Sequence, residues 1–263
     1  MLKDILVAII EDDLFSRNWM ALLLVRDWRT RVIAEVTDRQ ELTNFLANDQ
    51  SRIDILLVDV DFFGQVFNFT EIYQEMAKHQ KQYKVLCTGV KADKHILKQL
   101  NTETCCGYIL KHEIGYSLGW ALSFAAEGNW LFTPGTFDLA NKMNFNVPVN
   151  KMILKGRSHF PGFSDHETEV ARLAIIFSLG RRDLADELKI SDQWSYGLVS
   201  ELYTKLGLGE ILSGEVDPLL YLGNNPVLQF HFREIVDQLG TSKKARDLET
   251  LAFHLLTLPN IEN

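Results

Sequence analysis

The chain has 263 residues, of which 46% are apolar and 24% charged, and its formal net charge is −8. This length predicts two domains that can each bury a core, while the composition excludes a disordered or fibrous protein and three cysteines without metal-ligand spacing exclude a disulfide framework. The longest apolar run, residues 19–25, is too short to cross a bilayer, and the N-terminus lacks the features of a signal peptide, so we expect no membrane segment and a cytoplasmic location.

The first half of the sequence alternates short apolar runs with longer amphipathic segments. This alternation predicts an α/β fold over residues 1–128, a doubly wound (βα)5 domain with helices around a parallel sheet. The expected strands are Ile5–Ile10, Arg31–Val36, Ile55–Val60, Lys84–Thr88 and Gly107–Leu110. The expected helices are Phe15–Arg26, Arg39–Asn48, Thr70–His79, Lys94–Leu100 and Gly115–Glu127. In such a sheet, functional residues lie beyond the carboxyl ends of the strands.

The second half is expected to be all-α. Residues 129–162 contain turn formers and prolines, and we interpret them as a linker with one short helix near Phe137–Met143. Residues 163–208 then show helical spacing, with three helices that suggest a helix-turn-helix domain. The first is expected from a Ser164–Glu167 capping box to about Phe177, the second over Arg181–Lys189, and the third from the Ser191 cap to Leu206.

Residues 209–263 form an apolar tail, expected to be a helical C-terminal extension. Helices are expected at Val227–Leu239, behind Pro226, and at Lys243–Leu256, behind a cap at Thr241 or Ser242. Apolar residues such as Leu219, Leu220 and Tyr221 make the tail too apolar to stay solvated alone. It is therefore expected to pack on this chain or on a partner.

Acidic and polar residues occur at the ends of four expected strands. Glu11, Asp12 and Asp13 follow the first strand, and Asp59 ends the third. Thr88 ends the fourth strand, and Lys111 follows the fifth. Carboxylates that converge in one site repel one another unless a hard cation lies among them, and Mg²⁺ prefers oxygen ligands of this kind. The lysine and the hydroxyl would complete a site for a phosphoryl group.

These residues stand in motifs that resemble the receiver domain of bacterial two-component response regulators. The motifs are Ile9-Ile10-Glu11-Asp12-Asp13, Leu57-Val58-Asp59-Val60, Cys87-Thr88-Gly89 and Gly107-Tyr108-Ile109-Leu110-Lys111, and the resemblance spans residues 3–128. It implies that Asp59 accepts a phosphoryl group and that Thr88 and Lys111 contact its oxygens. It also implies Tyr108 as the switch aromatic and Glu11, Asp12, Asp59 and the backbone carbonyl of Asp61 as Mg²⁺ ligands. Phe63 stands where the family often has proline.

Residues 163–208 resemble the LuxR-type helix-turn-helix domain of NarL/FixJ-type regulators, with one residue inserted near Ile175–Ser178. The matching segments are residues 163–170, 183–191 and 205–208. The resemblance implies that the third helix enters the DNA major groove. That helix, however, has no arginine or lysine before Lys205, and residues 163–208 carry five basic and eight acidic side chains. The candidate DNA contacts are Arg181, Arg182, Gln193, Tyr196 and Lys205, with Lys151, Lys155 and Arg157 in the linker.

The leading hypothesis is a non-enzymatic response regulator that a sensor histidine kinase phosphorylates on Asp59 and that controls transcription through DNA. Phosphorylation is expected to promote a homodimer through the face carrying Lys94–Leu100, Tyr108 and Gly115–Glu127. The alternative is a phosphorylation-switched interaction protein whose degenerate helix-turn-helix binds protein instead of DNA. A phosphatase with a similar acidic pocket is a third hypothesis, which leaves residues 163–263 without a role.

Overall fold

The computed structural model describes residues 4–47, 52–62, 69–78, 82–215, 222–239 and 244–262. The chain divides into two compact units. One contains the residues up to Gly156 together with the segment from Pro259, and the other is Arg157–Leu258. The expected order of an α/β domain followed by an all-α domain is confirmed, although the boundary differs from the expected one. No helix among the described residues is long and apolar enough to span a membrane.

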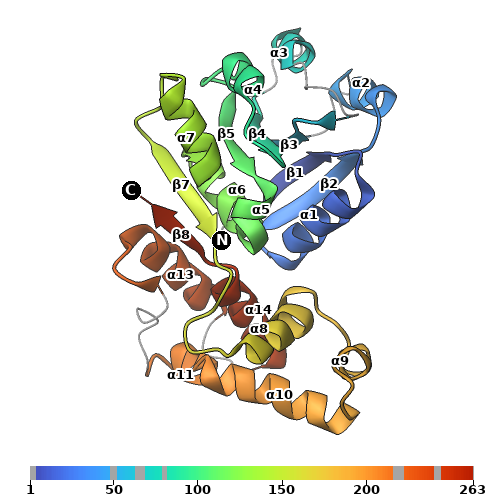
Figure 1. Cartoon of the computed structure of the whole chain (residues 1–263), viewed down its shortest axis with the longest axis vertical. Helices are drawn as coiled ribbons and strands as arrows, with labels where there is room; N and C mark the ends of the chain where they lie inside the picture. Colours follow the sequence, from blue (N-terminus) through green and yellow to red (C-terminus); the bar gives the residue numbers. More distant parts are fainter. Residues whose placement is uncertain are drawn as a thin grey trace. The chain divides into compact units, whose positions relative to one another are not determined.

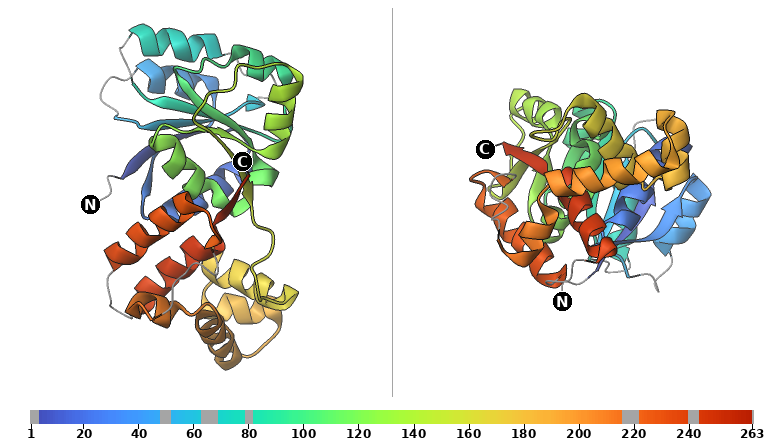
Figure 2. Two further views of the ribbon diagram at one scale, coloured as in Figure 1. Left: turned by 90° about the vertical axis from the view of Figure 1, so that its left-hand side faces the viewer. Right: turned by 90° about the horizontal axis from the view of Figure 1, so that it is seen from below.

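The first unit is built on one sheet with helices on both faces (Figures 1 and 2). Its strand order is β2-β1-β3-β4-β5-β6-β7-β8, and the pairs are parallel except for β7 with β8. The strands are β1 (Ile5–Ile10), β2 (Thr30–Val36), β3 (Ile55–Asp59), β4 (Lys84–Gly89), β5 (Cys105–Leu110), β6 (Trp130–Phe132), β7 (Lys151–Gly156) and β8 (Pro259–Glu262). The five expected strands are confirmed, and the sheet continues beyond them.

The helices of this unit form two layers. Helices α2 (Arg39–Ala47), α3 (Phe69–Lys78), α4 (Lys94–Gln99) and α7 (Pro134–Lys142) share one apolar core with the sheet. Helices α1 (Leu14–Arg26) and α6 (Leu118–Ala126) pack together elsewhere on the sheet. A short helix, α5 (Lys111–Ile114), and a 3₁₀ turn over Gly115–Ser117 precede α6.

The helix expected over Gly115–Glu127 therefore begins later, at Leu118, and it does not offer the exposed face expected for a homodimer. Every residue from Leu118 to Ala125 is buried, including the large side chains of Trp120 and Phe124. Helix α6 is apolar all round, and such a helix is stable only when it is covered on all sides. The part of the expected dimer face formed by this helix is not available in the structure.

The linker predicted over residues 129–162 contains the short helix expected near Phe137–Met143, which is α7, but the prediction missed the two sheet strands β6 and β7. Strand β6 extends the sheet because Gly107 of β5 lets it approach closely: a Cβ at Gly107 would lie 2.4 Å from the Leu131 carbonyl oxygen. Trp130, Leu131 and Phe132 are all buried. Pro134 occurs at the start of α7, where proline is tolerated because the first N–H groups of a helix have no partner inside it.

The tail prediction for residues 209–263 is wrong at its end, because residues 259–262 form strand β8 of the sheet instead of continuing a helix. Gly156 of β7 and Pro259 of β8 are partners in the register. The Arg157–Leu258 unit is thus inserted between Gly156 and Pro259, two residues that pair with each other in the sheet. Since β7 runs parallel to β1 through β6, this pair lies at the carboxyl edge of the sheet.

The Arg157–Leu258 unit begins with the three expected helices. They are α8 (Asp165–Ala171), extended by a π-turn over Arg172–Ile176, then α9 (Arg181–Leu188) and α10 (Asp192–Lys205). The Ser164–Glu167 capping box is present, and Ser191 caps α10 by accepting a hydrogen bond from the Trp194 N–H. A π-turn holds one residue more than an α-turn, which accounts for the inserted residue near Ile175–Ser178.

The tail packs on these helices, as expected, through α11 (Leu208–Ser213), α13 (Pro226–Leu239) and α14 (Ala245–Leu256). The residues that fill its core are apolar at helical spacing: Leu228, Phe232, Ile235, Leu251 and Leu255 are all buried. Leu219, Leu220, Tyr221 and the expected caps Thr241 and Ser242 lie outside the described residues. The described helices α8 to α11, α13 and α14 therefore pack together as one helical group.

We expect the substitution Gly156→Ala to destabilise the sheet unit. A Cβ at this position would lie 2.2 Å from the carbonyl oxygen and 2.7 Å from the carbonyl carbon of Ile114, and backbone atoms cannot rotate away as a side chain can. Overpacking of this kind costs about 1–3 kcal/mol. Thermal or urea unfolding of the full chain measures it.

Gly197→Ala is the matched control. Gly197 lies inside α10, and nothing lies within 4 Å of a Cβ placed there. Alanine should stabilise that helix by about 1 kcal/mol. If Gly156→Ala unfolded like the wild type, the close contact between β7 and Ile114 would be refuted.

Candidate functional site

The predicted site residues meet at the carboxyl edge of the sheet. Glu11 and Asp12 follow β1, Asp59 ends β3, and Lys111 follows β5. The parallel register pairs Ile10 with Val58, Asp59 with Thr88 and Gly89 with Leu110, so these strands end at a common level. The structure therefore brings all of them together.

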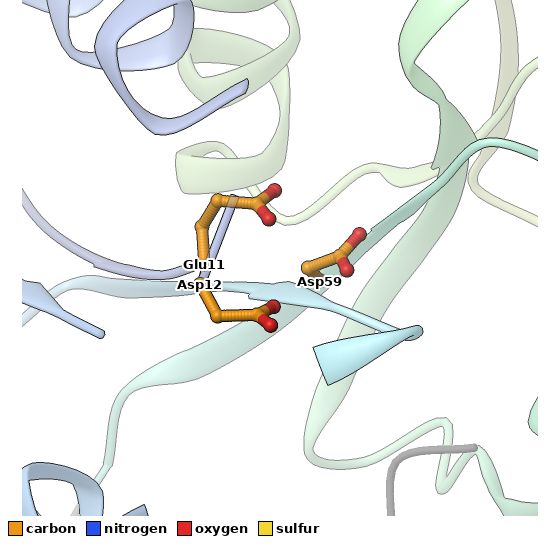
Figure 3. A group of neighbouring side chains, drawn as sticks. All are labelled: Glu11, Asp12 and Asp59. Carbon is orange, nitrogen blue, oxygen red and sulfur yellow. The ribbon is translucent and has the colours of Figure 1, made fainter. Parts of the chain in front are cut away.

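Three carboxylates form the centre of the site. Glu11, Asp12 and Asp59 each offer an oxygen within 4.8 Å of the others, and Figure 3 shows the side chains of Glu11 and Asp12 extending toward Asp59. Glu11 is 1% exposed and Asp59 is 4% exposed. Burial raises the pKa of both carboxyls, and the charge of Asp59 raises the pKa of Glu11 further. The ionised cluster therefore needs positive charge close by.

Lys111 supplies part of that charge. Its Nζ lies 2.5 Å from Glu11 Oε2 and 2.9 Å from Asp59 Oδ1. Burial by itself would lower the pKa of Lys111, but its hydrogen bonds to Asp59 and Glu11 outweigh burial and raise this pKa. The ammonium form is thus fixed between two carboxylates that come from different strands.

The segment that follows β1 forms hydrogen bonds with residues at the start of α1. Asp13 caps α1, accepting a 2.7 Å hydrogen bond from the Ser16 N–H, so its carboxylate serves the helix rather than the cluster. Arg17 Nη1 donates to the Glu11 carbonyl at 2.9 Å, and its Nε lies 3.4 Å from Glu35. Sequence reasoning missed Arg17, whose only signal is its place in the first turn of the helix that follows the acidic run.

Thr88 and Tyr108 lie on strands β4 and β5 behind the acidic cluster. The Thr88 hydroxyl donates to the Val58 carbonyl at 3.3 Å. Tyr108 is fully buried, its hydroxyl donates to the Lys91 carbonyl at 2.7 Å, and burial raises its pKa. The expected switch aromatic is therefore neutral and occupies an inward position in this structure.

Asp61 is next to the cluster, because its N–H donates to Asp59 Oδ2 at 3.2 Å. The role of its carbonyl as a metal ligand stays a prediction. Phe63, where the resemblance departs from the family pattern, lies outside the described residues.

Two of the candidate DNA contacts, Lys205 and Arg181, are engaged with other side chains of the helical unit. Lys205 Nζ lies 2.8 Å from both carboxylate oxygens of Glu167, and the Arg181 guanidinium lies 5.5 Å from the ring centre of Tyr196. Trp194 and Tyr196 of α10 are 58% and 62% exposed, and Arg182 and Gln193 are exposed as well. The exposed surface of α10 thus carries large aromatic groups.

The candidate DNA contacts that were expected in the linker lie in two different parts of the structure. Lys151 and Lys155 belong to strand β7 of the sheet unit, not to a linker. Arg157 is the first residue after that strand. A DNA surface made by the helix-turn-helix segment alone therefore does not include Lys151 or Lys155.

The chain was compared with known families, proteins and structures. No protein-family model matches it, and no curated protein matches it. The structural neighbours are response regulators of the NarL and RcsB type. RcsB of Salmonella typhimurium is 17% identical, covering 88% of this chain and 99% of that chain, with a TM-score of 0.45.

Two further neighbours belong to the same class. ChrA, the response regulator of a heme-sensing two-component system, is 21% identical over 78% of this chain and 92% of that chain, with a TM-score of 0.40. The signal receiver domain of NarL from Mycobacterium tuberculosis is 18% identical over 48% of this chain and 99% of that chain, with a TM-score of 0.39. These three TM-scores lie below 0.5, so the neighbours carry no conclusion about function.

We expect the Glu167–Lys205 contact to make the helical unit less stable in acid. The hydrogen bonds from Lys205 and from Ser164 lower the pKa of Glu167 from 4.5 to about 2. A carboxyl whose pKa is lower in the folded state stabilises that state above the unfolded pKa, and this stabilisation disappears as the pH falls through the folded value. Glu167→Gln should therefore lower the melting temperature at pH 7, and the difference should shrink between pH 4.5 and 2.

Circular dichroism melts at several pH values measure this difference. Glu201→Gln, an exposed glutamate of α10, is the control and should change neither the melting temperature nor its pH dependence. A Glu167→Gln protein with the pH dependence of the wild type would contradict the assignment.

Proposed function

We propose that this chain is a response regulator in which Asp59 accepts a phosphoryl group from a histidine kinase and thereby controls an output of the helical unit. The observation that carries this proposal is the arrangement around Asp59, a buried carboxylate at the carboxyl edge of the sheet with Lys111 Nζ 2.9 Å away. Two further carboxylates, Glu11 and Asp12, lie beside it. A carboxylate nucleophile needs this combination of positioning and charge compensation to accept a phosphoryl group.

The residues present fit a divalent cation. Three ionised carboxylates and one ammonium leave two negative charges, and oxygen ligands of this kind suit Mg²⁺. Glu11, Asp12 and Asp59, with the carbonyl of Asp61, would hold the ion. When bound, it would neutralise charge on the oxygens of the incoming phosphoryl group.

The chain's own residues have distinct parts in the transfer. A carboxylate oxygen of Asp59 forms the new bond to phosphorus as the bond from phosphorus to the kinase histidine nitrogen breaks, and the imidazole leaves with its electron pair. The Lys111 ammonium compensates the charge on the phosphoryl oxygens. The Thr88 hydroxyl turns from the Val58 carbonyl to the new phosphoryl group, while Tyr108 holds its inward position.

We expect the full chain to take up one phosphoryl group from phosphoramidate in the presence of Mg²⁺, and Asp59→Asn to abolish the uptake. The reason is that asparagine keeps the shape of the side chain but removes the nucleophile. Intact-mass measurement detects the adduct, and calorimetry with Mg²⁺ alone tests the metal ligands independently of phosphorylation.

Asp13→Asn is the matched control for this experiment. Asparagine caps a helix as well as aspartate does, so this variant should keep its phosphate uptake and Mg²⁺ affinity, whereas Asp12→Asn should lose Mg²⁺ affinity. An undiminished adduct in Asp59→Asn would refute Asp59 as the acceptor.

The proposed output is transcriptional control through α8, α9 and α10, whose order and caps are those of a helix-turn-helix. A second candidate, binding to a protein partner, is favoured by the surface of α10. Lys205 is paired with Glu167, and residues 163–208 carry a net charge of −3 from five basic and eight acidic groups. Exposed Trp194 and Tyr196 offer apolar contact instead of cations.

We expect the unphosphorylated full chain to bind generic duplex DNA weakly, with little dependence on salt. Each phosphate contact adds close to one to the negative slope of log K against log salt, and α10 provides few cations for such contacts. Titration of labelled duplex at several salt concentrations, with and without phosphoramidate, measures the slope. A steep slope after phosphorylation supports the transcriptional output, since two modules on one dimer gain affinity through effective concentration. A flat slope in both states would instead support binding to a protein partner as the output.

A further inference from the structure

Helix α5, which begins at Lys111, and the end of β5 are held by hydrogen bonds to the first turn of helix α7. The carboxylate of Glu113 accepts hydrogen bonds from the Gly135 N–H, with its two oxygens at 2.9 and 3.1 Å. The Leu110 N–H donates to Thr133 Oγ1 at 3.0 Å, and Thr136 Oγ1 donates to the Tyr108 carbonyl at 2.7 Å. The backbone on both sides of Lys111 is thus tied to the first turn of α7.

The first turn of α7 is suited to receive this carboxylate. Pro134 opens the helix and has no N–H, so the Gly135 N–H is the first donor available at that end. A carboxylate also interacts favourably with the positive end of the helix dipole. Glu113 therefore satisfies a donor that the helix cannot satisfy itself.

Gly135 makes the close approach possible. A Cβ there would lie 2.9 Å from Leu110 Cδ1 and 3.1 Å from Glu113 Oε1, closer than neighbours tolerate without moving. The backbone of Gly135 is helical, so a larger residue here is limited by space and not by conformation, and both nearest atoms are side-chain ends that would have to move. The contact is therefore tight on both sides, with Glu113 and Leu110 against one turn of α7.

We propose that Glu113 is a positioning residue for Lys111, and that strand β6 and helix α7 thereby belong to the phosphoryl-accepting site. Helix α5 has four residues, and a helix of one turn does not hold itself in place. Its anchor on α7 fixes the direction from which Lys111 reaches between Glu11 and Asp59. This inference rests on the proposed function of Asp59.

Three variants of the full chain test it with phosphoramidate and Mg²⁺. Glu113→Ala removes both acceptor oxygens, and we expect its maximal phosphorylation rate to fall about 10- to 100-fold, because a misplacement of about 1 Å has effects of this size. Glu113→Gln keeps one acceptor oxygen and should stay within about threefold of the wild type. Gly135→Ala leaves Glu113 intact but displaces its carboxylate by a few tenths of an ångström, so its maximal rate should lie between those of the wild type and Glu113→Ala.

Asp138→Asn is the matched control. Asp138 is an exposed carboxylate of α7 that forms no hydrogen bond or ion pair with the described residues, so this variant removes a charge from the same helix without touching α5. Its phosphorylation should equal that of the wild type. The half-saturating phosphoramidate concentration and the Mg²⁺ affinity should be unchanged in all four variants, since the ligands themselves are intact.

Further measurements separate positioning from stability and from the proposed function. Alanine favours a helix more than glycine does, so a purely structural role predicts that Gly135→Ala reacts like the wild type. The Lys111 Nζ resonance of ¹⁵N-lysine-labelled protein should shift in Glu113→Ala and Gly135→Ala and stay in place in Asp138→Asn. Wild-type maximal rates with an unshifted resonance would overturn the inference. A wild type that takes up no phosphate, but whose Lys111 resonance shifts as expected in the variants, would refute the proposed function alone.

Discussion

The Lys111 ammonium between the buried carboxylates of Glu11 and Asp59 is the interaction on which the rest of the site depends. Removing a buried cation and leaving its anions unpaired is strongly destabilising, so the three groups constrain one another. They come from the ends of β1, β3 and β5, and the parallel register places those ends side by side. The same positive charge that allows two acids to be buried here is the charge that a transferring phosphoryl group would require. The arrangement that stabilises the two buried acids is thus also the arrangement that the proposed phosphoryl transfer requires.

Strands β7 and β8 connect the carboxyl edge of the sheet to the helical unit. Strand β7 ends at Gly156, whose backbone packs against Ile114 at the end of α5, and β8 begins at its register partner Pro259. The helical unit is therefore joined to the sheet through two neighbouring strands instead of one flexible linker. A displacement of α5 would act on the β7 end of this join directly and on β8 through its ladder.

The sequence alone was sufficient for the features that follow a local rule. Apolar strands of five to seven residues, helix caps at Ser164 and Ser191, and acids after strands all have a recognisable pattern, and the structure has them in the expected order. Strands β6 and β8 have no such pattern, since three or four residues are too few for periodicity and their partners lie far away in sequence. The Glu113–Gly135 contact depends on β6, which leads into α7, so no reading of the residues around Lys111 could reveal it.

The two units differ in where their charged groups lie and in how these charges are compensated. In the sheet unit, charge is buried and compensated at short range, which suits the proposed recognition of a dianionic phosphoryl group. In the helical unit, the cation at the end of α10 is paired with Glu167, and large aromatic side chains remain exposed. Exposed tryptophan and tyrosine side chains are characteristic anchors of protein interfaces, whereas a groove-reading helix relies on cations and amides. An input that adds negative charge to an already acidic chain would weaken attraction to a polyanion, unless it also joined two modules. Pairing of helical units, rather than direct charge, is therefore the property that a DNA-binding output of this chain would have to gain on phosphorylation.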